Sequence, residues 1–190
     1  MNTLFPVERD YPAGFRYHPH FISKEEEDQL WNEIKNTELH TFFFQGYEAK
    51  RKVASFGWDW SFEKRALSKG KEIPAAFHWL IDKAAKMLQI PFESITELLI
   101  TEYPPGSVIN WHRDAPPFDT TIGISLLSDC LFQLRPYDKS KQGKKSIISI
   151  PLQRRSLYVM KDAARTDWEH RITPVKQTRY SITLRTLKAP

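Results

Sequence analysis

Three residues in the second half of the chain have the types and spacing that can bind a metal ion. His112 and Asp114 stand two positions apart at the end of an expected strand, so their side chains project from one face. His170 lies on a later expected strand and is the only one of the six histidines that follows this pair. Two histidines and a carboxylate are the ligand set of non-haem Fe(II) oxygenases, whereas buried histidines are otherwise often simply hydrogen-bonded.

The last expected strand carries a second chemically informative pattern. At a period of two, Tyr180, Ile182 and Leu184 share one face of this strand. Arginine side chains that enter a protein interior are costly unless anions pair with them, and guanidinium groups bind carboxylates through two hydrogen bonds. The opposite face therefore indicates a site for a small dianion, unless solvent covers it. Its residues are Arg179, Ser181, Thr183 and Arg185.

Together these motifs resemble the AlkB family of Fe(II)/2-oxoglutarate dioxygenases. The resemblance extends from about Arg51 to about Leu187 and implies a double-stranded β-helix, or jelly-roll, fold with Fe(II), 2-oxoglutarate and O₂ as cofactors. It rests on the interval from Tyr103 to His112, the segment His112-Arg-Asp114, the segment His170-Arg-Ile-Thr-Pro174 and the terminal segment Arg179-Tyr-Ser-Ile-Thr-Leu-Arg185.

The resemblance also implies roles for individual residues. Arg179 and Tyr103 would hold the distal carboxylate of 2-oxoglutarate, and Arg185 would lie near the carboxylate next to iron. The family often has asparagine at positions 101 and 181, where threonine and serine still offer hydrogen-bonding groups. The implied iron ligands are His112, Asp114 and His170, and the implied cosubstrate residues are Tyr103, Arg179, Arg185, Thr101 and Ser181.

The segment from Thr41 to Trp60 interleaves aromatic and cationic residues. Aromatic platforms beside cations suit a flipped or single-stranded nucleic-acid base. Within this segment, residues 51–57 resemble the substrate-side strand of the family. The alternative is a core strand with a basic turn, to which we assign Phe42–Phe44. The predicted substrate contacts are Tyr47, Arg51, Phe56 and Trp58.

Pro116 marks a departure from the family pattern. It stands where the bacterial prototype has a second aspartate that contacts the target base. A proline has no side-chain hydrogen-bond acceptor, so the base preference of the prototype does not transfer to this chain.

The elements that must position these residues follow from the periodicity. A capping box at Ser23 and Glu26 opens a helix that ends at Asn36, and a second helix extends from Pro74 to Pro91. We predict an α+β, mainly β, fold in which these helices brace one sheet of a jelly roll. The expected strands are Ile95 to Tyr103, Val108 to His112, Thr121 to Leu127, Cys130 to Arg135, Lys145 to Ile150, Arg154 to Met160, Trp168 to Ile172 and Arg179 to Thr186.

Length and composition narrow the class of protein. The 190 residues, 41% of them hydrophobic, indicate one domain, with helices and a substrate-side lid over about 1–94 and the jelly-roll core over about 95–187. The lone Cys130 and the lack of a long apolar run favour a cytoplasmic protein that does not span a membrane, and a monomer is expected. The net charge of +5 weakly favours an anionic partner such as nucleic acid.

Three functions are compatible with this pattern. The first is oxidative demethylation of alkylated nucleic-acid bases, which releases formaldehyde, succinate and CO₂. The second is the same chemistry on a protein side chain, a modified tRNA nucleoside or a small molecule, and Pro116 keeps it open. The third is a binding module without enzymatic activity, in which the two histidines and Asp114 are structural.

Overall fold

The alternation of side chains after residue 95 produces the strands expected there. The strands Ile95–Tyr103 and Trp168–Ile172 have the expected bounds, and the other expected strands differ by one to three residues at their ends. Three strand starts differ by three residues. The strand expected from Thr121 begins at Phe118, a 3₁₀ turn at Lys144–Ser146 delays a second strand, and the positive φ of Arg155 (67°) delays the third. These strands are β5 (Ile95–Tyr103), β6 (Ile109–His112), β7 (Phe118–Leu126), β8 (Cys130–Pro136), β9 (Ile148–Leu152), β10 (Leu157–Met160), β11 (Trp168–Ile172) and β12 (Arg179–Leu187).

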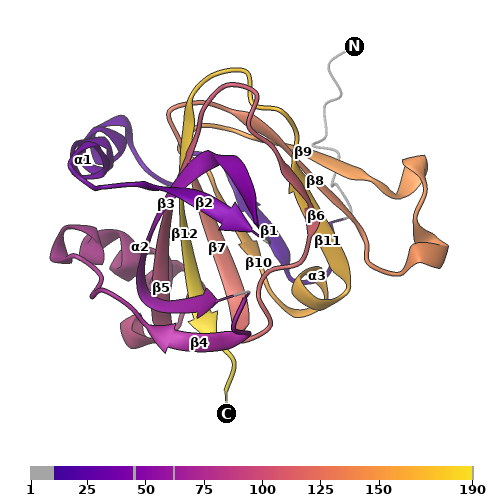
Figure 1. Ribbon diagram of the computed structural model, residues 1–190, viewed down its shortest axis with the longest axis horizontal. Coiled ribbons are helices and arrows are strands. Elements are labelled where there is room, and N and C mark those ends of the chain that lie inside the picture. The colour runs from indigo at the N-terminus through magenta and orange to yellow at the C-terminus, as the bar shows by residue number, and fades with distance from the viewer. Residues whose placement is uncertain (1–10, 45, 62, 190) are drawn as a thin grey trace.

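The computed structural model describes residues 11–44, 46–61 and 63–189, which form two antiparallel sheets (Figure 1). The large sheet has the order β1-β10-β7-β12-β5-β3-β2, with β4 paired to β3, and the small sheet has the order β6-β11-β8-β9. Strand β12 therefore lies in the middle of the large sheet, between β5 and β7. The remaining strands of the large sheet are β1 (Phe15–His18), β2 (His40–Phe44), β3 (Tyr47–Ser61) and β4 (Ala66–Lys69).

Local signals define the two long helices. Helix α1 (Lys24–Lys35) begins after the expected capping box, in which the Ser23 backbone N–H donates to Glu26 Oε2 at 2.7 Å and the Glu26 N–H donates to Ser23 Oγ at 3.1 Å. At the second helix, Pro74 opens a 3₁₀ turn at Ala75–Phe77, and α2 (His78–Leu88) follows it. The left-handed conformation of Gln89 ends α2. A short helix, α3 (Asp162–Thr166), precedes β11.

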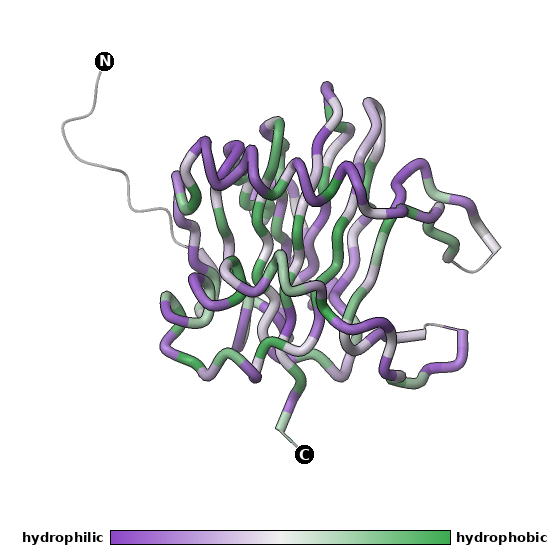
Figure 2. Tube along the Cα trace, turned by 90° about the vertical axis from the view of Figure 1, so that its left-hand side faces the viewer, coloured by the Kyte–Doolittle hydropathy of each residue, from purple (hydrophilic) through white to green (hydrophobic). Residues whose placement is uncertain are grey.

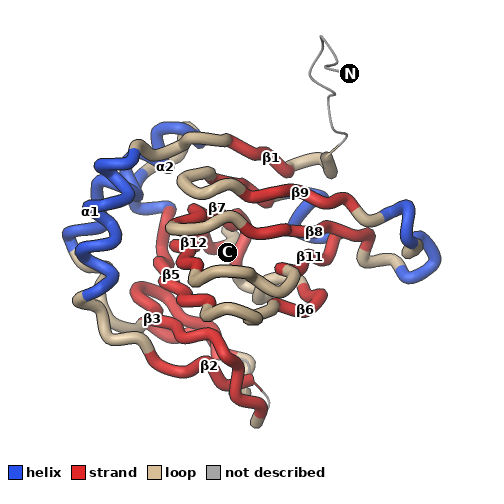
Figure 3. The backbone as a smooth tube through the Cα atoms, turned by 90° about the horizontal axis from the view of Figure 1, so that it is seen from above, coloured by secondary structure: helices blue, strands red, loops and turns tan. Residues whose placement is uncertain are grey.

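The large sheet separates two apolar clusters. Helices α1 and α2 cover its outer face, and the small sheet lies on the other side (Figure 3). The first cluster joins residues of the helices, such as Leu30 and Leu80, to the outer face, which includes Leu98 and Ile182. The second cluster fills the space between the sheets around Phe132. Figure 2 shows apolar residues alternating with polar ones along the strands, which gives each side of the large sheet its own chemistry.

Strands β1 and β4 and the short helix α3 were not predicted from sequence. Strand β1 is only four residues long, and β4 is largely exposed, so neither carries a clear alternation of apolar and polar residues. Strand β3 was expected only at residues 51–57, by resemblance, and it extends from Tyr47 to Ser61. Gly57, with φ of 83°, lets this long strand bend where a Cβ would meet the Thr96 carbonyl oxygen.

Substitution of Leu98 tests the role of the helix-covered face. Leu98 is 0% exposed and lies in the first apolar cluster, so Leu98→Ala should lower the free energy of unfolding by about 2–5 kcal/mol. Urea titration followed by circular dichroism measures this change. The control is Leu131→Ala on β8, where the side chain is 39% exposed and a change below about 1 kcal/mol is expected. Equal effects of the two substitutions would contradict this description of the core.

Candidate active site

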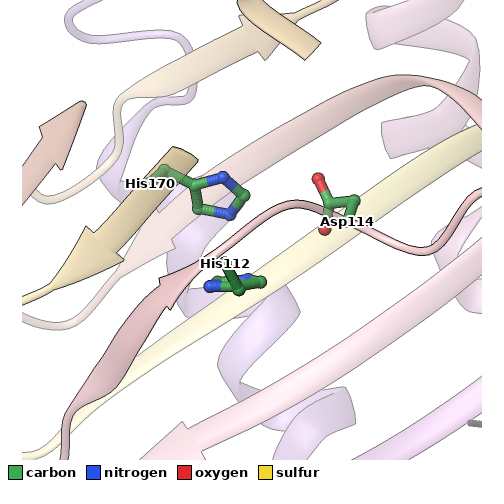
Figure 4. A group of neighbouring side chains, drawn as sticks. All are labelled: His112, Asp114 and His170. Atoms are coloured by element: carbon green, nitrogen blue, oxygen red, sulfur yellow. The ribbon is translucent and has the colours of Figure 1, made fainter. Parts of the chain in front are cut away.

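The two histidines and the aspartate converge between the sheets. His112 ends β6, His170 lies in the middle of β11, and these two residues are directly paired in the small sheet. Asp114 lies in the loop after β6 rather than on the strand, so the expected alternation on one strand is not what brings it to His112. One potential ligand atom from each of the three side chains lies within 4.8 Å of the others, and the side chains point toward one another (Figure 4).

Both imidazoles are held in the neutral form that binds metal ions. His112 Nδ1 donates to the Asn110 carbonyl oxygen at 2.8 Å, which leaves Nε2 with a free lone pair. Burial is the main cause that lowers the pKa of His112. Burial, followed by the nearby His112, lowers the pKa of His170 to about 3. The ring centroids are 4.1 Å apart, so protonation of both rings at once would be strongly disfavoured.

Asp114 is held in the ionised form by a set of donors. Burial alone would raise the pKa of its carboxyl group, but the positive charge of Arg185 opposes this effect, and the pKa lies well below its usual value. Arg185 Nη2 donates to Oδ1 at 3.1 Å, and Thr121 Oγ1 donates to Oδ2 at 3.0 Å. Each carboxylate oxygen thus has one fixed partner and retains a lone pair that a metal ion can use.

Arg185 is itself fixed between two carboxylates. Its Nη1 donates to Glu97 Oε2 at 2.6 Å, while its Nη2 contacts Asp114. Arg165 adds a second positive charge, with its Nε 4.0 Å from Asp114 Oδ2. The structure places Arg185 beside the carboxylate ligand, and its predicted contact with the cosubstrate carboxylate near iron stays a prediction.

The residues fit a ferrous ion. Two neutral imidazoles and one carboxylate, all buried or half-buried, form a facial set that leaves further positions on the metal open. His170 Nδ1 is buried and has no hydrogen-bond partner among the residues that the structure describes. With Fe(II), a 2-oxo acid and O₂ bound, such a centre supplies the oxidising power, and the protein supplies position and shelter from water.

A second buried charge lies on the same side of the large sheet. Arg179 is 1% exposed, its Nε donates to Ser125 Oγ at 3.1 Å, and its guanidinium lies 4.9 Å from the ring centroid of Tyr103. Arg179 Nη1 has no hydrogen-bond partner among the described residues. A buried guanidinium without an anion is costly, so this group fits a carboxylate of a bound ligand.

The other predicted cosubstrate residues share this face. Strand register pairs Arg179 with Tyr103 and Ser181 with Thr101. The hydroxyl groups of Ser181 and Tyr103 lie 3.5 Å apart. The polar face of β12 is therefore turned toward the space between the sheets, and solvent does not cover it, because Arg179, Ser181 and Thr183 are all buried.

The predicted substrate contacts divide into three groups. Arg51 is half-buried, lies 4.1 Å from the ring centroid of Phe42 and acts electrostatically on His112, which places it on the metal side of β3. Trp58 pairs with Lys69 beyond the bend at Gly57, and its role stays a prediction. The side chain of Tyr47 lies outside the part of the chain that the structure describes.

Phe56 requires a correction. It pairs with Leu98 and packs against the first apolar cluster, on the face that the helices cover. A side chain on that face cannot reach the metal ligands, so the predicted substrate contact of Phe56 is wrong. The expected burial of Phe42–Phe44 also fails at Phe43, which is 64% exposed. Both errors arise because the period of two shows which side chains share a face without showing which face is the core.

Several supporting residues were missed from sequence. Thr121 and Ser125 hold Asp114 and Arg179, and Glu97 holds Arg185. The signal that was available is the run Thr121, Gly123 and Ser125, which alternates small polar or glycine residues with isoleucine along β7. This alternation gives β7 a face of small and polar residues. Together with the polar face of β12, it indicates that two neighbouring strands line one polar site.

Comparison with known proteins agrees with this geometry. A family model described as the 2OG-Fe(II) oxygenase superfamily matches residues 14–185. The chain belongs to this superfamily. It is thus a 2-oxoglutarate dioxygenase that uses Fe(II), 2-oxoglutarate and O₂, as expected from sequence.

Individual relatives confirm the AlkB-like resemblance. The chain is 30% identical over 172 residues to mouse (Mus musculus) tRNA (carboxymethyluridine(34)-5-O)-methyltransferase ALKBH8. This alignment covers 87% of this chain and 25% of that protein. It is 34% identical over 102 residues to the uncharacterized protein L905 of Acanthamoeba polyphaga mimivirus, over 47% of each chain. The chain therefore spans about a quarter of the length of the ALKBH8 relatives that it matches.

Solved structures confirm the fold class. The structure of OsALKBH1 superposes with a TM-score of 0.73 at 12% identity over 95% of this chain and 100% of that one. A prolyl hydroxylase from Trichoplax adhaerens, solved in complex with a hypoxia inducible factor peptide fragment, superposes with a TM-score of 0.64 at 15% identity. This superposition covers 92% of this chain and 83% of that one. Among the described helices, none has the length and apolar character needed to cross a membrane.

Removal of one imidazole tests the metal centre. His112→Ala removes one of the three protein ligands, so the affinity for Fe(II) should fall by at least tenfold. The unfolding midpoint should change little, because His112 is only half-buried. Anaerobic metal titration measures the affinity. The control His40→Ala, at an exposed histidine on β2, should bind Fe(II) like the unmodified protein. Unchanged affinity in His112→Ala would contradict the ligand assignment.

Substitution of Arg179 tests the cosubstrate pocket. Arg179→Lys keeps the charge but cannot form two parallel hydrogen bonds to a carboxylate, so the dissociation constant of 2-oxoglutarate should rise by about tenfold or more. Calorimetric titration of the anaerobic Fe(II) protein measures this constant, with Fe(II) affinity as the internal control. Equal 2-oxoglutarate affinity in the variant would show that Arg179 does not bind the cosubstrate.

Proposed function

We propose that this protein oxidises alkyl groups on nucleic-acid bases and that tRNA is the first substrate pool to test. Where the alkyl group is an N-methyl group, the hydroxylated product releases formaldehyde and the unmodified base. The chemistry follows from the superfamily, and the proposal concerns the substrate. The observation that carries it is an aromatic and cationic hairpin beside the metal ligands.

This hairpin consists of β2 and the first half of β3, at one edge of the large sheet (Figure 3). Arg51 stacks on Phe42 at 4.1 Å, and the neighbouring Phe43 ring is 64% exposed. Lys50 Nζ lies 3.5 Å from the place that a Cβ on Gly106 would take, so the hairpin lies close to the loop that leads to β6 and His112. Exposed aromatic rings beside cations suit a base and its phosphates.

The similarity to ALKBH8 supports nucleic acid over protein as the substrate. The name of that protein describes a tRNA methyltransferase, and this chain aligns with about a quarter of it. Which base is oxidised does not follow from the similarity. Pro116 is exposed and borders a groove of about 390 Å³ with Arg113, Asp114 and Lys188, where it has no side-chain acceptor for a base edge.

The activity test combines two readouts. Anaerobically prepared Fe(II) protein is mixed with 2-oxoglutarate and O₂, and with either tRNA that carries its natural modifications or methylated DNA and RNA oligonucleotides. Succinate is quantified, and the nucleosides are analysed by mass spectrometry after digestion. The proposal expects substrate-dependent succinate together with loss of one CH₂ from a base and release of formaldehyde. His112→Ala, run in parallel, should give neither product.

Other outcomes of this assay decide against the proposal. A base that gains one oxygen and keeps its alkyl group would show nucleic-acid oxidation without dealkylation, and the demethylase part would be rejected. Succinate formation that no nucleic acid stimulates, together with stimulation by a peptide or small-molecule pool, would reject nucleic acid as the substrate.

Phe43 provides a separate test of the hairpin. Phe43→Ala removes an exposed ring, and loss of one base-stacking contact should weaken nucleic-acid binding by about tenfold, in line with about 1–3 kcal/mol per stacked base. Fluorescence anisotropy with a labelled oligonucleotide measures binding. Leu131→Ala, an exposed apolar residue on β8, is the matched control and should bind normally. Equal binding by both variants would remove the hairpin from the substrate site.

A further inference from the structure

One tyrosine lies in the space between the sheets, without a role in the site described above. Tyr158 on β10 pairs with Gly123 on β7, and its ring lies directly over this glycine. A Cβ on Gly123 would come within 2.2 Å of Tyr158 Cε1 and 2.7 Å of its hydroxyl oxygen. Gly123 therefore leaves the room that the phenol ring occupies, and these two residues form a matched pair.

The position of the hydroxyl group follows from the neighbours of Gly123. In β7, Thr121 and Ser125 lie on the same face as Gly123, two residues away on either side. Thr121 holds Asp114, and Ser125 holds Arg179. The Tyr158 hydroxyl, above Gly123, is thus placed between the metal-ligand end of the cavity and the arginine end.

Packing fixes the ring in this position. The centroid of the Tyr158 ring is 4.9 Å from that of Phe132, and Phe132 in turn stacks on His170 with centroids 5.4 Å apart. Phe15 stacks on Tyr158 from another direction, at 6.2 Å and nearly parallel. With aromatic rings around it and Gly123 beneath it, the phenol has little freedom to turn away from the cavity.

The hydroxyl group is an available donor. Among the residues that the structure describes, none forms a hydrogen bond with it. Burial, followed by the negative charge of Asp114, raises its pKa above the usual value for tyrosine, so the proton stays on the oxygen. Tyr158 is half-buried, and a phenol packed between two sheets in this way is normally hydrogen-bonded.

We propose that Tyr158 is a cosubstrate-binding residue, whose ring forms one wall of the 2-oxoglutarate pocket and whose hydroxyl donates a hydrogen bond to a carboxylate oxygen of the bound 2-oxo acid. Arg179 then provides positive charge at one end of the pocket, and a metal ion held by His112, Asp114 and His170 would provide it at the other. Tyr158 acts between them. This inference rests on the cofactors of the superfamily and is independent of the substrate proposed above.

Tyr158→Phe tests this role because it removes one oxygen atom and keeps the ring that fills the space over Gly123. The matched control is Tyr180→Phe. Tyr180 lies on the helix-covered face of β12, next to Arg179 in sequence, and its ring packs edge-on against Trp31 at 5.0 Å. Both variants are loaded anaerobically with Fe(II), and 2-oxoglutarate is titrated by calorimetry without any nucleic acid.

The expected result is a dissociation constant for 2-oxoglutarate about tenfold or more higher in Tyr158→Phe, as for loss of a hydrogen bond to a charged group. Fe(II) affinity should stay unchanged in this variant, and Tyr180→Phe should bind both ligands normally. A second measurement is the rise of the unfolding midpoint on addition of 2-oxoglutarate, which should be smaller in Tyr158→Phe than in the unmodified protein.

Two results would overturn the proposal. Equal 2-oxoglutarate affinity in Tyr158→Phe and the unmodified protein would show that the hydroxyl does not contact the cosubstrate. A matching loss of Fe(II) affinity would show that Tyr158 acts on the metal centre instead. Because nucleic acid is absent from the titration, failure here leaves the proposed substrate untouched, and failure of the nucleic-acid assay leaves this inference untouched.

Discussion

The pairing of His112 with His170 across β6 and β11 is the constraint on which the rest of the site depends. This pairing brings two imidazoles within 4.1 Å of each other, centroid to centroid, in a position where burial keeps both neutral. A third ligand must then come from a loop, because β6 ends at His112. Asp114 takes this position because Arg185 and Thr121 hold its two oxygens. Burial of Arg185 is in turn made acceptable by its second carboxylate partner, Glu97.

The two faces of the large sheet have different roles, one in stability and the other in ligand binding. The outer face is apolar and packs against α1 and α2, which supplies most of the first core cluster. The inner face carries arginine, serine, threonine and tyrosine side chains from β5, β7, β10 and β12. Such a face is costly in an ordinary core, because Arg179 Nη1 lacks a protein partner among the described residues. A small dianion bound between the sheets offsets this cost.

Much of this arrangement was predictable from sequence because the signals are local. The alternation along β12 predicted its polar face, and the order of the histidines predicted which one joins the pair. The faces of β3 were not predictable. Phe56 and Arg51 stand five positions apart and so lie on opposite faces, and only the contact of β3 with β5 shows which face the helices cover. The contact of Arg185 with Asp114 and the place of Tyr158 depend on distant segments of the chain, which no local pattern encodes.

In this site one ferrous ion and one 2-oxo acid are expected to bind together at His112, Asp114 and His170, with Arg179 at the far end of the acid. Visible absorption of the anaerobic protein tests this most directly, because a 2-oxo acid chelated to Fe(II) gives a weak charge-transfer band that neither ligand gives alone. The band should appear on addition of 2-oxoglutarate to the Fe(II) protein and should be absent in Asp114→Ala. A protein that binds both ligands without the band, or a band that persists in Asp114→Ala, would contradict this arrangement.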